Sequence, residues 1–146
     1  MPIRYKLVQR KDFTKGAPAD GKRFYAQLVS NGTVSLDELC ESIAEETAQT
    51  SADVKSIFDR LPHVLRRHLG EGRNVQMGEF GSIRPTLGSQ GSLTKKDFNA
   101  ATMMKKPGMV FTPGKLLQKM RDDATFLRVK DPDEETTGDS ESPDEI

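Results

Sequence analysis

The sequence predicts an α+β fold, because segments of two different hydrophobic periods follow one another along a single chain. Residues alternate with the period of a strand near the N-terminus and again after residue 73, whereas two segments between them have the 3.6-residue period of a helix. The 146 residues are enough for one domain with extensions. A hydrophobic fraction of 34% is low for a chain that buries a core of its own. We therefore expect either a disordered portion or a core that a second copy completes.

The first 33 residues are expected to form a β-hairpin. Residues 3–9 (IRYKLVQ) and 23–29 (RFYAQLV) both read as strands. The KGAPADG segment between them is rich in turn-forming residues, and the Asn31-Gly32 pair ends the second strand.

Two amphipathic helices are expected next. Ser35 is a natural N-cap, with Glu38 placed to complete a capping box, and one face of the first helix is apolar: Leu36, Leu39, Cys40, Ile43 and Ala44. Thr50 or Ser51 caps the second helix, whose apolar stripe ends before Gly70 and Gly72: Val54, Ile57, Phe58, Leu61, Leu65 and Leu69.

The remainder of the body is predicted to be a sheet with a long polar insertion. Residues 74–77 and 78–85 read as strands, with Gly78 and Gly81 at the turn. Residues 86–104 contain too few apolar side chains to form core, so we expect an extended ribbon or a mobile loop. The segment 105–111 reads as a returning strand. Thr112 is then expected to cap a third helix that has Pro113 at its first position.

The charges are separated along the chain. The sequence has 22 basic and 22 acidic residues, a net charge of zero. Residues 1–130 hold 22 basic and 14 acidic residues, a net charge of +8, and residues 131–146 hold eight acidic residues and no Lys or Arg. A basic body with an acidic tail is compatible with a nucleic-acid partner, and the tail composition predicts disorder.

Several functional classes are disfavoured. No apolar run approaches the roughly 18 residues of a membrane span, and the N-terminus lacks the apolar stretch of a signal peptide, so we expect a cytoplasmic protein. Cys40, His63 and His68 are too few soft ligands for a closed zinc site. No catalytic constellation or phosphate-binding glycine motif is present. The sequence thus predicts no enzyme, no cofactor and no small-molecule substrate.

Three segments resemble the HU and integration host factor family of histone-like DNA-bending proteins. Residues 43–61 (IAEETAQTSADVKSIFDRL) are similar to its helix-turn-helix, and EFGSI at 79–83 is similar to the turn at the base of its arm. FTPGKLLQKM at 111–120, the most specific of the three, is similar to the start of its last helix. The likeness covers roughly residues 34–125, and the extended chain resembles HU-related proteins typical of Bacteroides-type bacteria.

The resemblance implies an HU-like (IHF-like) fold, an intertwined homodimer with a helical base and two β-arms. Residues 1–33 would be an N-terminal β-hairpin extension, 34–130 the DNA-binding domain with its arm at about 84–110, and 131–146 a disordered acidic tail. The implied function is that of a nucleoid-associated protein, which binds duplex DNA with little sequence specificity through phosphate and minor-groove contacts and bends or compacts it.

Candidate DNA-binding residues follow from the same likeness. The turn at Gly81 and the start of the last helix (Thr112, Gly114 and Lys115) would approach phosphates, because a helix start offers unpaired N–H groups. The remaining candidates form a positive surface along the arm: Arg84, Lys95, Lys96, Lys105 and Lys106. Family arms carry an Arg-rich stretch and a tip proline that wedges between bases, whereas residues 86–104 contain neither residue type. Phe98 or Met103 is the apolar substitute expected from the sequence.

Two alternatives stay open. The chain could be an HU-fold structural or protein-interaction dimer that has lost DNA bending, with its N-terminal strands pairing to another sheet edge. The acidic tail could compete with DNA for the basic surface as an intramolecular polyanion, or simply solubilise the protein.

Overall fold

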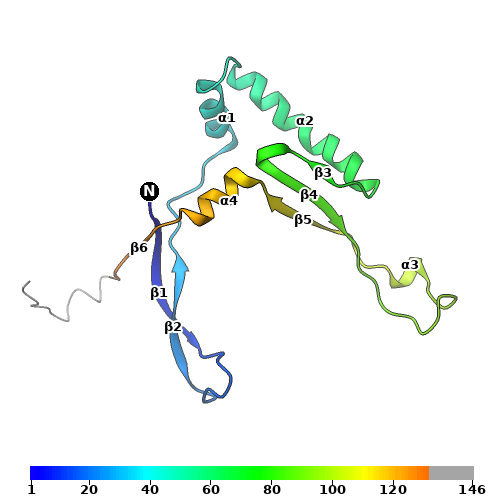
Figure 1. Cartoon of the computed structure of the whole chain (residues 1–146), viewed down its shortest axis with the longest axis horizontal. Helices are drawn as coiled ribbons and strands as arrows, with labels where there is room; N and C mark the ends of the chain where they lie inside the picture. Colours follow the sequence, from blue (N-terminus) through cyan, green and yellow to red (C-terminus); the bar gives the residue numbers. More distant parts are fainter. Residues whose placement is uncertain (132–146) are drawn as a thin grey trace, which may run out of the picture. The chain divides into compact units, whose positions relative to one another are not determined.

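The computed structural model describes residues 1–131 and divides into two compact units (Figure 1). One unit contains Met1–Thr33 together with the segment that begins at Ala124, and the other is Val34–Asp123. Apart from Asp131, the predicted acidic tail lies outside the described residues.

The N-terminal unit is a three-stranded sheet. Strands β1 (Ile3–Lys11) and β2 (Lys22–Leu28) pair antiparallel without interruption, from Tyr5 opposite Leu28 to Lys11 opposite Lys22. Strand β6 (Phe126–Arg128) pairs parallel with the start of β1, which places β1 in the centre. The structure therefore groups residues 124–131 with the hairpin. The resemblance had implied a DNA-binding domain that ends at residue 130.

Helices α1 (Leu36–Glu45) and α2 (Ser51–Gly70) begin at the predicted caps. Ser35 Oγ accepts a hydrogen bond from the Glu38 N–H at 3.2 Å. The full reciprocal capping box is found at Thr50, whose side chain accepts from the Asp53 N–H at 3.2 Å while its own N–H donates to Asp53 Oδ2 at 3.1 Å. These bonds satisfy amides that a helix start leaves unpaired.

The second sheet has the order β3-β4-β5. Its strands are β3 (Val75–Gln76), β4 (Gly81–Thr86) and β5 (Gly108–Pro113), with the 3-10 turn η1 (Gly78–Phe80) between β3 and β4. Between β4 and β5 the chain extends away from the sheet and carries the short helix α3 (Ala100–Met103) (Figure 1). Helix α4 (Lys115–Asp122) follows β5 directly.

The predicted start of the last helix was wrong. Thr112 and Pro113 belong to β5, where they pair with Ser82 and Gly81, and the N-cap is Gly114, which has no side chain to form a cap bond. The β4 pairing holds these two residues extended, so the local capping preference of Thr and the helix-start preference of Pro do not decide the boundary.

Few apolar side chains are covered within the chain. Among residues 1–131 only Cys40 and Val54 are buried hydrophobic residues. The helical stripes stay partly open to solvent: Ile57 on α2 is 62% exposed and Leu36 on α1 is 43% exposed, whereas several other stripe residues are half-buried. Burial of two side chains cannot offset the conformational entropy of folding a domain.

Candidate nucleic-acid interface

The predicted phosphate-binding residues meet at one place in the structure. All four line a common hollow: Gly81, Thr112, Gly114 and Lys115. The other residues of its wall are Gln76, Gly78, Glu79, Ser82 and Pro113. It forms because antiparallel pairing of β4 with β5 sets Gly81 opposite Pro113, directly before α4 begins. Segments 30 residues apart in the sequence thus build a single polar site.

Two glycines allow this close approach. Gly81 has a φ of 132°, a conformation that L side chains rarely adopt, and a Cβ there would overlap the Thr112 carbonyl oxygen. A Cβ at Gly114 would overlap the carbonyl oxygen of Glu79. The site therefore requires glycine at both positions for backbone packing, independently of any ligand.

Existing hydrogen bonds decide which backbone amides remain free to donate to an anion. The Gly81 N–H donates to the Gly78 carbonyl, and the Gly114 N–H donates to the Phe80 carbonyl at 3.1 Å, so both are already used. The first-turn amides of α4, from Lys115 to Leu117, have no partner inside the helix and none from a cap side chain. These amides, the positive end of the helix and the Lys115 ammonium together favour a phosphate.

Two aromatic side chains pack against each other beside the hollow. The Phe80 and Phe111 rings lie 5.4 Å apart between centroids at an angle of 46°. Phe80 ends the η1 turn and Phe111 precedes Thr112, so their contact ties the two walls of the hollow together.

The arm begins as a regular ribbon. Its pairing continues past β4 and β5 through the Ser89–Met104 bridge, with Lys105 N–H donating to the Gly88 carbonyl at 2.9 Å. Asn99 caps α3 by accepting from the Ala101 N–H at 3.0 Å. Residues 86–104 are thus partly an extended ribbon, as one of the two expectations had it, and partly the short helix α3, which was not predicted.

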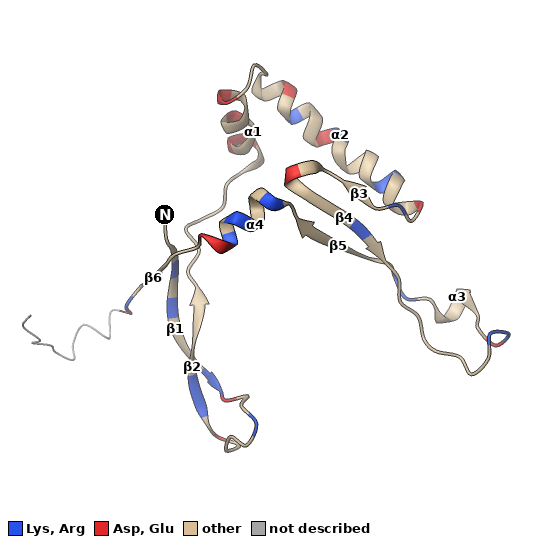
Figure 2. Cartoon of the chain, in the orientation of Figure 1, with Lys and Arg blue, Asp and Glu red and all other residues tan. Residues whose placement is uncertain are grey.

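The predicted basic residues are all exposed. Arg84 lies on β4, Lys105 and Lys106 follow the bridge, and Lys95 and Lys96 lie in the segment beyond it. Neither these five side chains nor Lys115 forms an ion pair with any residue of the described chain. Their positive charges are therefore available to an external anion (Figure 2).

One apolar residue of the arm was overlooked in the sequence. Leu93 is fully exposed, at 101%, among Gly, Ser and Thr. Phe98 is only 38% exposed, and Met103 is partly covered, with its sulfur 3.3 Å from the Asn99 nitrogen. The available signal was a leucine flanked by Ser92 and Thr94 in a Gly/Ser-rich segment, and its full exposure makes Leu93 the apolar arm side chain freest to contact a ligand.

Other kinds of site find little support in the part of the chain that the structure describes. Within residues 1–131, no group of three or more His, Cys, Asp or Glu side chains could hold a metal ion. Cys40, on α1, is a buried free cysteine. No helix among these residues is both long and apolar enough to cross a membrane.

Comparison with known proteins identifies the family. The family model described as an HU domain fused to wHTH, Ig or glycine-rich motifs matches residues 1–128, and the chain belongs to this family. A crystal structure of a protein from Bacteroides vulgatus, provisionally described as a bacterial DNA-binding protein, is similar to it with a TM-score of 0.55 and 18% identity. The match covers 88% of this chain and 49% of that one, so the chain spans about half of its length. No curated protein matches.

Proposed function

We propose that this protein binds duplex DNA with little sequence preference, as an HU-like, nucleoid-associated protein. The observation that carries the proposal is the meeting of the Gly81 turn with the start of α4, together with an arm whose lysine side chains form no ion pair within residues 1–131. The HU-domain family and the structural neighbour from Bacteroides vulgatus support it.

Phosphate contact would supply the affinity. Lysines that meet phosphates release condensed counterions from DNA, and this gain does not depend on base sequence. The hollow would receive one phosphate at the start of α4, and Arg84, Lys95, Lys96, Lys105 and Lys106 would follow the backbone along the arm. Leu93 would act as the wedge that a tip proline provides in related arms, so that the duplex kinks toward its major groove.

A homodimer would complete the core. The apolar stripes of α1 and α2 remain partly exposed within one chain, and a two-fold partner would cover both of them. Two arms would then embrace one duplex, which is the arrangement that bending and compaction require.

Charge reversal along the arm tests the proposal. The full chain and a Lys95→Glu/Lys96→Glu/Lys105→Glu/Lys106→Glu variant are compared by band shift on a generic duplex at low salt. Because each reversal replaces attraction to phosphate by repulsion, the variant should lose most of its affinity. A variant with wild-type binding and a wild-type thermal melt would overturn the arm as the DNA surface.

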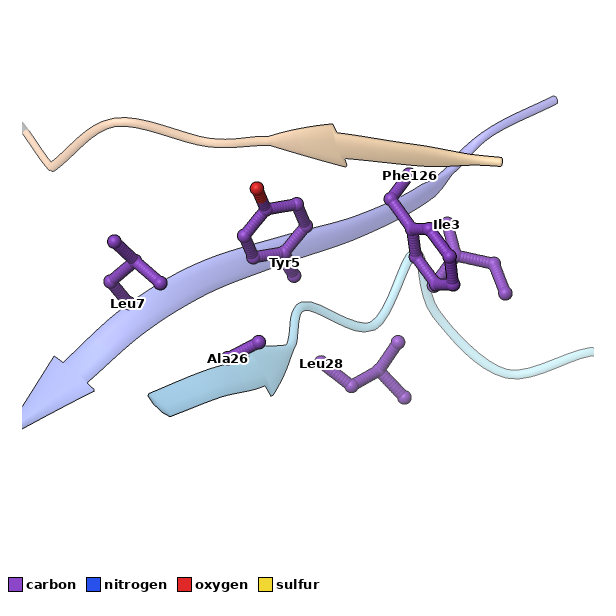
Figure 3. A pocket seen from close by; sticks show the side chains of 6 residues that line it. All are labelled: Ile3, Tyr5, Leu7, Ala26, Leu28 and Phe126. Carbon is purple, nitrogen blue, oxygen red and sulfur yellow. The ribbon is translucent and has the colours of Figure 1, made fainter. Parts of the chain in front are cut away.

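A protein-interaction dimer is the second candidate, and one feature favours it. One face of the N-terminal sheet is apolar and uncovered within its unit, where Ile3, Tyr5, Leu7, Ala26, Leu28 and Phe126 line a shared hollow (Figure 3). Such a face is typical of an interaction surface. This function predicts a stable dimer that shows no affinity for duplex DNA at low salt.

A further inference from the structure

Positive charge is concentrated in residues 1–33, which precede the larger unit and do not form the arm. Residues 1–33 contain seven basic and two acidic residues, a net charge of +5. The larger unit, 34–123, contains 13 basic and 12 acidic residues, a net charge of only +1 over 90 residues. Most of the excess charge of the body is therefore outside the HU-like part.

Strand alternation sorts these charges onto one face. In β1, side chains at odd and even positions point to opposite sides of the sheet, and the odd positions Ile3, Tyr5 and Leu7 form the apolar face. The even positions Arg4, Lys6 and Arg10 therefore share the other face. The uninterrupted register with β2 adds Arg23, Tyr25 and Gln27 to this same side. Figure 2 shows Lys and Arg on both strands.

Most positive side chains on this face of the sheet are not paired with a carboxylate of the described residues. Arg23 is paired with Asp12 at 2.7 Å, and Arg4 donates to the neutral Asn31 side chain at 3.1 Å. Lys6 and Arg10 form no ion pair within residues 1–131. Three positive side chains of β1 are thus not neutralised, and no acidic residue of β1 or β2 lies between them.

We propose that this face of the N-terminal sheet is a second DNA-binding surface, which contacts the phosphate backbone. The six steps along the strand from Arg4 to Arg10 span roughly 20 Å at about 3.3 Å per residue. Each strand of B-DNA carries one phosphate per roughly 3.4 Å of axis, so the row can follow several consecutive phosphates. Guanidinium and ammonium groups suit this ligand, because both donate several hydrogen bonds to phosphate oxygens.

The inference rests on the proposed function, since a duplex held by the HU-like unit would be present near the sheet at a high effective concentration. Phosphate contacts from a linked module raise affinity without any sequence preference. The N-terminal sheet would then extend the length of duplex that one molecule covers.

Removing positive charges from this face of the sheet, in the full chain, tests the proposed DNA-binding surface. Lys6→Gln/Arg10→Gln, which changes two residues of β1, is compared with Lys11→Gln/Lys22→Gln, which removes the same charge from a cross-strand pair of β1 and β2 on the opposite face. The affinity for a generic duplex is measured across a salt series. The first variant should reduce the slope of log K against log salt by about 2, which is the loss of two phosphate contacts, and the control should leave the slope unchanged.

Three results would overturn the assignment. An unchanged slope for Lys6→Gln/Arg10→Gln would show that the face makes no phosphate contact, and equal effects of both variants would show that the face is not specific. A raised affinity would mean that the face holds an acidic segment such as 131–146 instead of DNA. The arm variant separates the two proposals: if the arm variant binds normally and the sheet variant does not, the proposed arm fails and the sheet surface stands.

Discussion

The Gly114 N–H donates to the Phe80 carbonyl at 3.1 Å, and this bond joins the start of α4 to the turn before β4. A Cβ at Gly114 would overlap the Glu79 carbonyl, so the contact requires glycine. The bond uses the Gly114 amide, which the sequence had assigned to phosphate, and leaves the first-turn amides of α4 for an anion. A tight backbone junction thus determines where a phosphate can bind.

Gly114→Ala should destabilise the protein. The added methyl group forces the α4 start away from η1, and overpacking of this kind costs about 1–3 kcal/mol in the free energy of unfolding. Chemical denaturation would measure the loss. Gly91→Ala is the matched control, because a Cβ at Gly91 meets nothing within 4 Å. Equal stability of the two variants would contradict the junction as described.

Thr50→Ala should weaken the start of α2. It removes the acceptor for the Asp53 N–H and leaves that amide without its cap, which typically costs about 1 kcal/mol. Thermal unfolding followed by circular dichroism would measure the effect, with Ser51→Ala as a control that leaves the cap intact. A Thr50→Ala melt that matches the control melt would show that the capping box contributes nothing.

The same cap should make stability depend on pH. Hydrogen bonds from Thr50 lower the pKa of Asp53 below its ordinary value of 3.8. A carboxyl with a lowered folded-state pKa contributes stability above its unfolded pKa and loses it as the pH falls through the folded value. The stability gap between wild type and Thr50→Ala should therefore be largest near neutral pH and narrow below pH 3.8. A gap that widens on acidification would contradict this role.

Leu93→Ala should reduce DNA bending more than DNA affinity. Phosphate contacts supply the affinity, whereas an apolar wedge acts by unstacking a base step. Energy transfer between dyes at the two duplex ends would report the bend. Leu87→Ala, which changes another exposed leucine (68%), is the control, and a bend that is equally reduced in both variants would remove the specific role of Leu93.

Ile57→Asp should prevent dimer formation. Ile57 is 62% exposed on the apolar stripe of α2, and a carboxylate there would have to be desolvated at the proposed two-fold interface. Sedimentation velocity would show a monomer or an unfolded chain for this variant and a dimer for the wild type. Ser56→Asp places the same charge on the neighbouring helical position as a control. A dimeric Ile57→Asp protein would place the interface elsewhere.

Local patterns predicted the elements that local chemistry determines. Ser35 and Thr50 cap their helices as expected, because a cap needs only its own side chain and the next three residues. The α4 boundary failed at Thr112 and Pro113, where cross-strand pairing with β4 overrides the local preference. Strand β6 was missed because three residues carry no readable period, and they become a strand only by pairing with Ile3–Tyr5.

In the candidate site, too, local sequence predicted some features, whereas pairing between distant segments determined others. The residues of the FTPGK segment and the Gly81 turn do line one hollow, yet the sequence could not indicate that the Gly81 and Gly114 amides are used internally. Strand alternation places Lys6 and Arg10 on one face, and the register between β1 and β2, which the sequence does not determine, adds Arg23 to that face.

The central claim is tested most directly by titrating the full chain with a generic duplex at low salt and again at higher salt. Binding through lysine–phosphate contacts predicts tight binding at low salt and a linear fall of log K with log salt. Absence of binding at low salt, or an affinity that does not change with salt, would contradict the account.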